Sequence, residues 1–144
     1  MAERKAFAVI LDAGSATFSI ILLRLFLEIF NFDRTTNWKT LAVDSFVACL
    51  LLLISFIAVH LIAEKPSIAT AAVGSLLGSS FLILYILIRG IVLDWPYLKD
   101  NLDKLYVRHF DTTFFMLWLI VCVLSFVAVI SARAIKGFFQ IKLR

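Results

Sequence analysis

Charged residues are scarce in this chain of 144 residues. They make up 17% of the sequence, whereas a soluble domain averages about 25%. Hydrophobic residues make up 62%, compared with about 45–50% in a soluble domain. This balance excludes an ordinary soluble protein and predicts an integral, multi-pass membrane protein. We therefore expect the lipid bilayer to be its main partner, and we expect no nucleic-acid partner.

Cysteine is also rare, and its placement excludes several kinds of site. Cys49 and Cys122 are the two cysteines, and both fall within long apolar runs, where a thiol behaves as a small hydrophobic group. No disulfide can therefore link the loops, which argues against claudin-like proteins with their outer-loop cysteine pair. The sequence has neither a CxxC motif nor a zinc-ligand spacing. We expect no metal and no cofactor.

Catalytic motifs are missing as well. The sequence shows no nucleophile with a neighbouring base and no glycine-rich phosphate loop. Its serines are scattered among apolar residues, which is typical of groups that pack helices together. We expect that the protein is not an enzyme.

Four apolar runs each exceed the roughly 20 residues that a transmembrane helix needs. They cover residues 6–30, 41–63, 68–93 and 110–132. The sequence predicts an all-α fold with one domain, residues 1–144, built as an up-down bundle of four transmembrane helices. In the third connection the apolar residues recur at helical spacing, which predicts a short interfacial helix; they are Leu98, Leu102, Leu105 and Tyr106.

The distribution of lysine and arginine predicts the orientation. Seven lie near the span ends on the side of the termini: Arg4, Lys5, Lys65, Arg133, Lys136, Lys142 and Arg144. Five lie on the other side: Arg34, Lys39, Lys99, Lys104 and Arg108. This excess places both termini in the cytoplasm. Near the C-terminus, Lys136, Lys142 and Arg144 alternate with apolar residues, which suits contact with anionic lipid.

Several charged residues fall inside the predicted spans. Counting 1.5 Å per residue from each span centre puts Arg24, Glu28, Asp44 and Arg89 roughly 9–15 Å from the midplane on the outer side. Asp111 lies just beyond them. Because an ionisable group in hydrocarbon needs a partner or a function, two interpretations stay open. These groups form a structural charge network, or they form a site for a polar substrate or a proton.

Asp12 and His60 lie on the inner side, roughly 9 and 12 Å from the midplane. Asp44 and His60 are about 160° apart around the second helix, so we expect one of them to meet a headgroup or a partner. We interpret His60 as an interfacial residue. Asp12 and His60 are also candidates for contact with a partner or for ion coupling.

Small residues on the third span predict close helix packing. Gly74 and Gly78 form a GxxxG motif, and Ser75 extends the same surface. The motif leaves open whether the contact is within the chain or with another subunit.

Two functions fit these features. The first is a non-enzymatic tetraspan scaffold or accessory subunit of a larger membrane assembly. The alternative is a small transporter or channel component that uses Asp12, as the small multidrug-resistance transporters use a glutamate in their first span, or the layer of Arg24, Glu28, Asp44 and Arg89. The topology resembles MARVEL-type tetraspan proteins, and Arg24 matches the arginine in the first span of their CASP-like branch. The acidic residue of that branch's third span has no counterpart here.

Overall fold

The computed structural model describes residues 2–30, 37–63, 65–105 and 112–142. Within these residues, four helices are long and apolar enough to cross a membrane. They are α1 (Ala2–Ile29), α2 (Trp38–Ile62), α3 (Ile68–Leu98) and α5 (Thr112–Lys142). The all-helical, multi-pass character predicted from the sequence is confirmed at this level. Asp111 lies outside the described residues, as do Arg144 and the side chain of Lys142.

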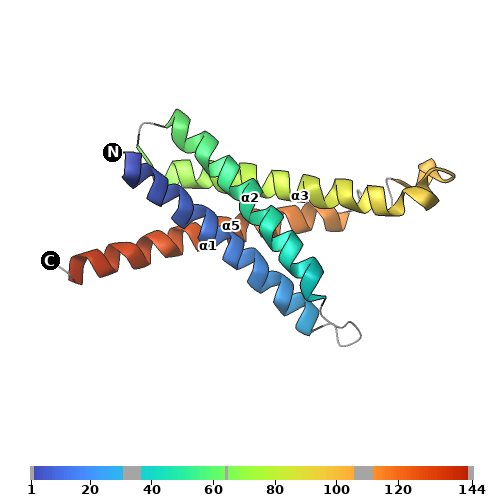
Figure 1. Cartoon of the computed structure of the whole chain (residues 1–144), viewed down its shortest axis with the longest axis horizontal. Coiled ribbons are helices and arrows are strands. Elements are labelled where there is room, and N and C mark those ends of the chain that lie inside the picture. Colours follow the sequence, from blue (N-terminus) through green and yellow to red (C-terminus); the bar gives the residue numbers. More distant parts are fainter. Residues whose placement is uncertain (1, 31–36, 64, 106–111, 143–144) are drawn as a thin grey trace.

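The helices form a closed ring in which each packs on two neighbours. α2 packs between α1 and α3, and α5 packs between α3 and α1. Figure 1 shows α1 and α2 side by side, crossing α3 and α5 at an angle. We call the end where α1 begins and α5 ends the termini end, and the end where α1 ends and α2 begins the loop end.

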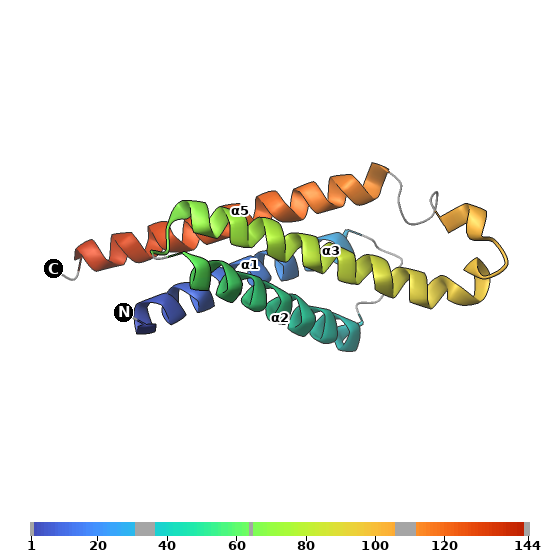
Figure 2. The ribbon, with the colours of Figure 1, turned by 90° about the horizontal axis from the view of Figure 1, so that it is seen from above.

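Two helices are considerably longer than the apolar runs that predicted them. α3 continues through Pro96 to Leu98, and α5 continues through Arg133 to Lys142. Figures 1 and 2 show the last turns of α3 and α5 reaching beyond the rest of the bundle at opposite ends. The sequence estimate stopped at the first polar residue, although a helix continues as long as its backbone bonds are made and its polar side chains can reach water.

The interfacial helix predicted after the third span is not confirmed by the described residues. Leu98, assigned to that helix, is part of α3 and is fully buried. In the described residues that follow, the 3₁₀ turn η1 (Leu102–Lys104) is followed directly by Leu105, which is helical. Leu102 is exposed, and Tyr106 lies outside the described residues.

Local signals fix two helix starts. The Asn37 side chain accepts a hydrogen bond from the Thr40 backbone N–H at the start of α2. Ser67 and Thr70 form a reciprocal capping box at the start of α3. Caps of this kind satisfy backbone donors that a helix leaves open at its first turn.

Apart from Phe56, most side chains of the core are small or medium in size, which lets the helices approach closely. Gly74 and Gly78 of α3 face Phe56 and Leu52 of α2, and both of these α2 side chains are fully buried. A Cβ at either glycine would lie 2.4 Å from the facing side chain, far inside normal contact. The GxxxG surface is therefore occupied by a contact within the chain. Ser75, beside it, is also buried.

Hydroxyl and indole groups join α3 to α5. Ser79 donates a hydrogen bond to Ser125 at 3.3 Å, and the Trp118 indole N–H donates to Ser80 at 3.1 Å. Such bonds hold neighbouring helices in register where the surroundings are apolar.

Candidate functional site

The charged residues inside the helices form two groups, one in each half of the bundle. The loop-end cluster contains Arg24, Glu28, Asp44 and Arg89. The termini-end cluster contains Asp12, His60 and Arg133. Each cluster joins residues from three helices, so each ties the bundle together where hydrocarbon would otherwise surround a charge.

Asp44 is the centre of the loop-end cluster. Each of its two carboxylate oxygens accepts a hydrogen bond from a guanidinium group, one from Arg24 of α1 and the other from Arg89 of α3. Arg24 also donates through Nε to Glu28, 3.3 Å away and one turn further along α1. The structure thus brings together four of the five residues placed at this depth by the sequence, and the fifth is Asp111.

The four charges of the loop-end cluster sum to zero, but one acceptor is left over. Oε2 of Glu28 is shielded from solvent and has no hydrogen-bond partner in the described part of the chain.

Asp44 carries two ion pairs and Glu28 carries one. We therefore expect Asp44→Asn to lower the thermal unfolding temperature more than Glu28→Gln, because the first change leaves two arginines without their shared carboxylate. Thermal unfolding in mild detergent measures the unfolding temperature of each variant. Equal decreases for the two substitutions would contradict the prediction.

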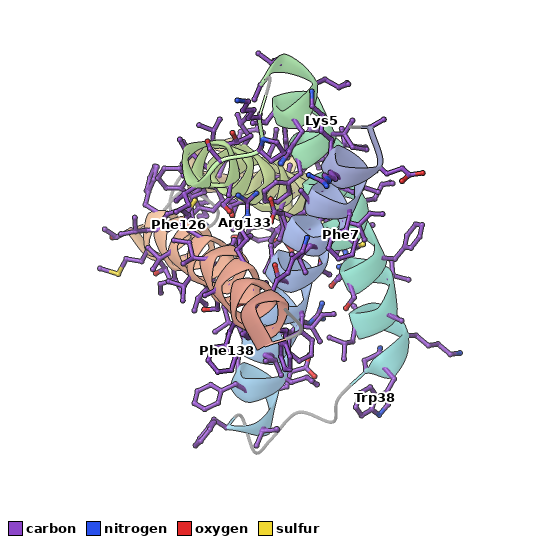
Figure 3. The ribbon with its side chains drawn as sticks, turned by 90° about the vertical axis from the view of Figure 1, so that its left-hand side faces the viewer. Lys5, Phe7, Trp38, Phe126, Arg133 and Phe138 are labelled. Atoms are coloured by element: carbon purple, nitrogen blue, oxygen red, sulfur yellow. The ribbon has the colours of Figure 1, made fainter. Side chains whose placement is uncertain are left out.

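Asp12 is the most deeply buried charge described, with a side chain that is fully inaccessible to solvent. Arg133 of α5 holds it in a two-pronged arrangement: Nε donates to Oδ1 at 3.0 Å and Nη2 donates to Oδ2 at 2.5 Å. A paired fork of this kind is the strongest form of carboxylate recognition by arginine. Figure 3 looks along the bundle from the termini end and shows Arg133 reaching toward the middle of the helices.

His60 of α2 completes the termini-end cluster. Its Nδ1 lies 2.8 Å from the backbone oxygen of Phe56. Because a carbonyl oxygen can only accept, Nδ1 carries the hydrogen of that bond. Nε2 then lies 3.7 Å from Oδ2 of Asp12 and has no hydrogen-bond partner among the residues that the structure describes. A second proton on the ring would place a donor opposite the carboxylate, so the cluster has room for one more proton.

The interpretation of His60 as an interfacial residue is wrong. His60 is 3% exposed and faces Asp12 inside the bundle. Asp44 also contacts partners within the chain, so neither residue needs a headgroup or a second protein. The angle of about 160° between them is accommodated because α2 lies between two helices and buries more than one face.

Sequence reasoning missed Arg133. It was counted with the cytoplasmic loop charges because the fourth span was expected to end at residue 132. One signal in the sequence could have identified it. Asp12 lies inside a predicted span, so a cation at a similar depth on another helix was to be expected. An arginine stem of several carbons can run back along a helix to reach such a partner.

Two cavities adjoin the clusters. The loop-end cavity, about 290 Å³, lies between all four helices, with Arg24, Asp44 and Arg89 at one end and residues such as Ala48, Leu82 and Val121 along its apolar walls. The termini-end cavity, about 300 Å³, is more polar and has Asp12, Arg4, Arg133 and Lys136 in its wall. Among the described residues, no three His, Cys, Asp or Glu side chains gather closely enough to hold a metal ion.

Comparison with protein-family models, with curated proteins and with solved structures finds no match to this chain.

Proposed function

We propose that this chain is a non-enzymatic tetraspan membrane protein that serves as a scaffold or accessory subunit of a larger membrane assembly. The observation that carries the proposal is the mutual pairing of its buried charges. Arginines and carboxylates from different helices neutralise one another in both clusters. Such groups hold helices in place, and a paired carboxylate has little capacity left for chemistry on a substrate.

In this proposal the helices cross the bilayer as an up-down bundle with both termini in the cytoplasm. The lysine and arginine count supports this orientation. Trp38, Trp95 and Tyr97 are exposed near the loop end, where aromatic residues mark a membrane surface. At the termini end, the Lys136 ammonium lies 4.0 Å from the centre of the Phe7 ring and joins the start of α1 to α5. Lys136 would meet anionic lipid headgroups there, and from the sequence alone we extend this contact to Lys142 and Arg144.

The projecting end of α5 is the surface that we assign to a partner subunit. Ile135, Phe138 and Phe139 are each about 60% exposed on a part of the helix that extends past its neighbours. An exposed aromatic and aliphatic surface beside basic residues is typical of a contact with another membrane helix or with the bilayer surface. The GxxxG face and His60 are used within the chain and are therefore not available for this purpose.

Native mass spectrometry of the particle extracted in mild detergent tests the proposal. We expect foreign subunits in a fixed ratio, and the paired substitution Ile135→Ala with Phe139→Ala should release them while the unfolding temperature stays unchanged. Phe18→Ala is the matched control, because Phe18 is 61% exposed on α1. A particle that contains only this chain, in every extraction, would overturn the proposal.

A small transporter or channel component is the second candidate, and one observation favours it. Asp12 lies in the wall of the termini-end cavity, next to a histidine nitrogen that has no hydrogen-bond partner in the described part of the chain. A carboxylate that borders a polar cavity and has a protonatable neighbour is a reasonable ion-coupling group.

Flux measurements in liposomes separate the two candidates. A transporter should move protons or cations, and Asp12→Asn should abolish that flux, because the amide carries no charge to couple. Ser15→Ala on the same helix serves as the control for reconstitution. Absence of flux in the unsubstituted protein would remove the second candidate.

A further inference from the structure

We propose that the loop-end cavity binds a single-chain anionic amphiphile, a long-chain carboxylate, with its headgroup at Arg24 and Arg89 and its chain among the apolar walls. The proposal goes beyond the scaffold function. It depends on the shape and charge of the cavity and not on any partner subunit.

The first argument is the size and lining of the space. Protein interiors are close-packed and rarely leave voids larger than a water molecule. A cavity of about 290 Å³ has room for roughly 10 water-sized groups, at about 30 Å³ each. Its walls are almost entirely aliphatic, so water gains little there, whereas a hydrocarbon chain would restore the missing contacts. The volume suits part of one hydrocarbon chain and is too small for the two chains of a phospholipid.

The second argument is the charge at the head of the cavity. Arg24, Arg89 and Asp44 line it, whereas Glu28, which is ion-paired to Arg24, is not part of its wall. A guanidinium group has five N–H donors. The hydrogen bonds to carboxylates described here use two donors of Arg24 and one of Arg89. Both arginines therefore retain donors for a second carboxylate, which a guanidinium binds in a paired arrangement.

The third argument is the direction of the polarity. The charged end of the cavity lies at the loop end, and the apolar end lies toward the middle of the bundle, where Leu82 precedes Arg89 by seven residues. At 1.5 Å per residue this separation is about 10 Å. An amphiphile in the adjacent leaflet has the same order, with its headgroup outward and its chain inward. It could enter from the side without turning over.

Fluorescence quenching gives a direct test, because one tryptophan lies near the cavity. Trp118 packs against the cluster that contains Ile83 and Val121, and both of these residues line the cavity. With Trp38→Phe and Trp95→Phe, Trp118 is the single tryptophan of the chain. Titration with 9,10-dibromostearate should quench its fluorescence saturably, and unbrominated stearate should reverse the effect. Affinity should rise with chain length and level off once the cavity is filled.

Three comparisons decide the result. Ala48→Phe and Leu82→Phe, which fill the cavity, should each reduce affinity at least tenfold, whereas Ala42→Phe on the exposed face of α2 should not. Arg89→Gln should weaken binding more than Arg89→Lys, which keeps the charge. Stearyl alcohol should compete poorly, because it lacks the anionic group.

Other outcomes would overturn the proposal. Equal quenching by a brominated phospholipid would indicate contact with bilayer lipid at the protein surface. If both cavity-filling variants were quenched as strongly as the unsubstituted cavity, the amphiphile would be partitioning into the detergent or bilayer and not binding a site. Competition by stearyl alcohol as strong as that by stearate would lead to the same conclusion. The chain-length series needs no substitution at the cavity, so it decides the matter even if a cavity variant fails to fold. These results leave the scaffold proposal untouched, since subunit composition is measured separately.

Discussion

Asp12→Ala is expected to destabilise the protein by about 3 kcal/mol, the low end of the range for breaking a buried ion pair. The change removes the carboxylate that Arg133 binds and that His60 faces. The charge of Arg133 is then left without its partner inside the bundle. The effect falls at the low end because the Arg133 side chain is 22% exposed and can turn toward the adjoining cavity.

Unfolding by sodium dodecyl sulfate in mixed micelles, followed by circular dichroism, measures this loss. Glu3→Ala is the control, because Glu3 is an acidic residue exposed in the first turn of the same helix. If Asp12→Ala cost no more than Glu3→Ala, the termini-end cluster would not be holding α1, α2 and α5 together.

Gly74→Ala is expected to destabilise the protein by about 1–3 kcal/mol, because it overpacks the interface between α2 and α3. The added methyl group would lie 2.4–2.5 Å from two ring atoms of Phe56, which is fully enclosed and cannot move aside without disturbing the core. Gly78→Ala should cost less. Its methyl would meet the terminal methyl of Leu52, and that group can shift by rotation of its own side chain.

Two glycines elsewhere in the chain provide matched controls. A Cβ at Gly14 or at Gly137 has nothing within 4 Å. Alanine at these positions should be neutral or slightly stabilising, because it favours a helix over glycine by up to about 1 kcal/mol. The same detergent unfolding assay applies. Equal effects at Gly74 and Gly14 would show that the α2 and α3 interface is not close-packed at the glycine.

The four helices could be predicted from hydrophobicity alone, since each contains a long apolar run. Their ends could not. The transition from hydrocarbon to water is gradual, and long polar side chains reach water from within the last turns of a helix. For this reason α5 extends ten residues beyond the predicted limit at residue 132.

The loop-end cluster could be predicted from depth along each helix, because Arg24, Glu28, Asp44 and Arg89 lie at similar depths and their four charges balance. Depth does not specify which residues touch, and only the structure shows Asp44 bridging two arginines. The termini-end cluster was less accessible. Arg133 lay outside the predicted fourth span. The position of His60 was inferred from α2 considered by itself, although α2 packs against both α1 and α3. The cavities depend on side-chain packing and have no signal in the sequence.

A double-mutant cycle on Asp12 and Arg133 tests most directly the claim that paired charges within the chain hold this bundle together. The unfolding free energies of Asp12→Ala, Arg133→Ala and the double variant are compared with that of the unsubstituted protein. If the two residues are partners, the double variant should lose less than the two single losses combined, by about 1–3 kcal/mol. Losses that add to within about 0.5 kcal/mol would mean that Asp12 and Arg133 do not interact, and the account of a self-neutralised bundle would be contradicted.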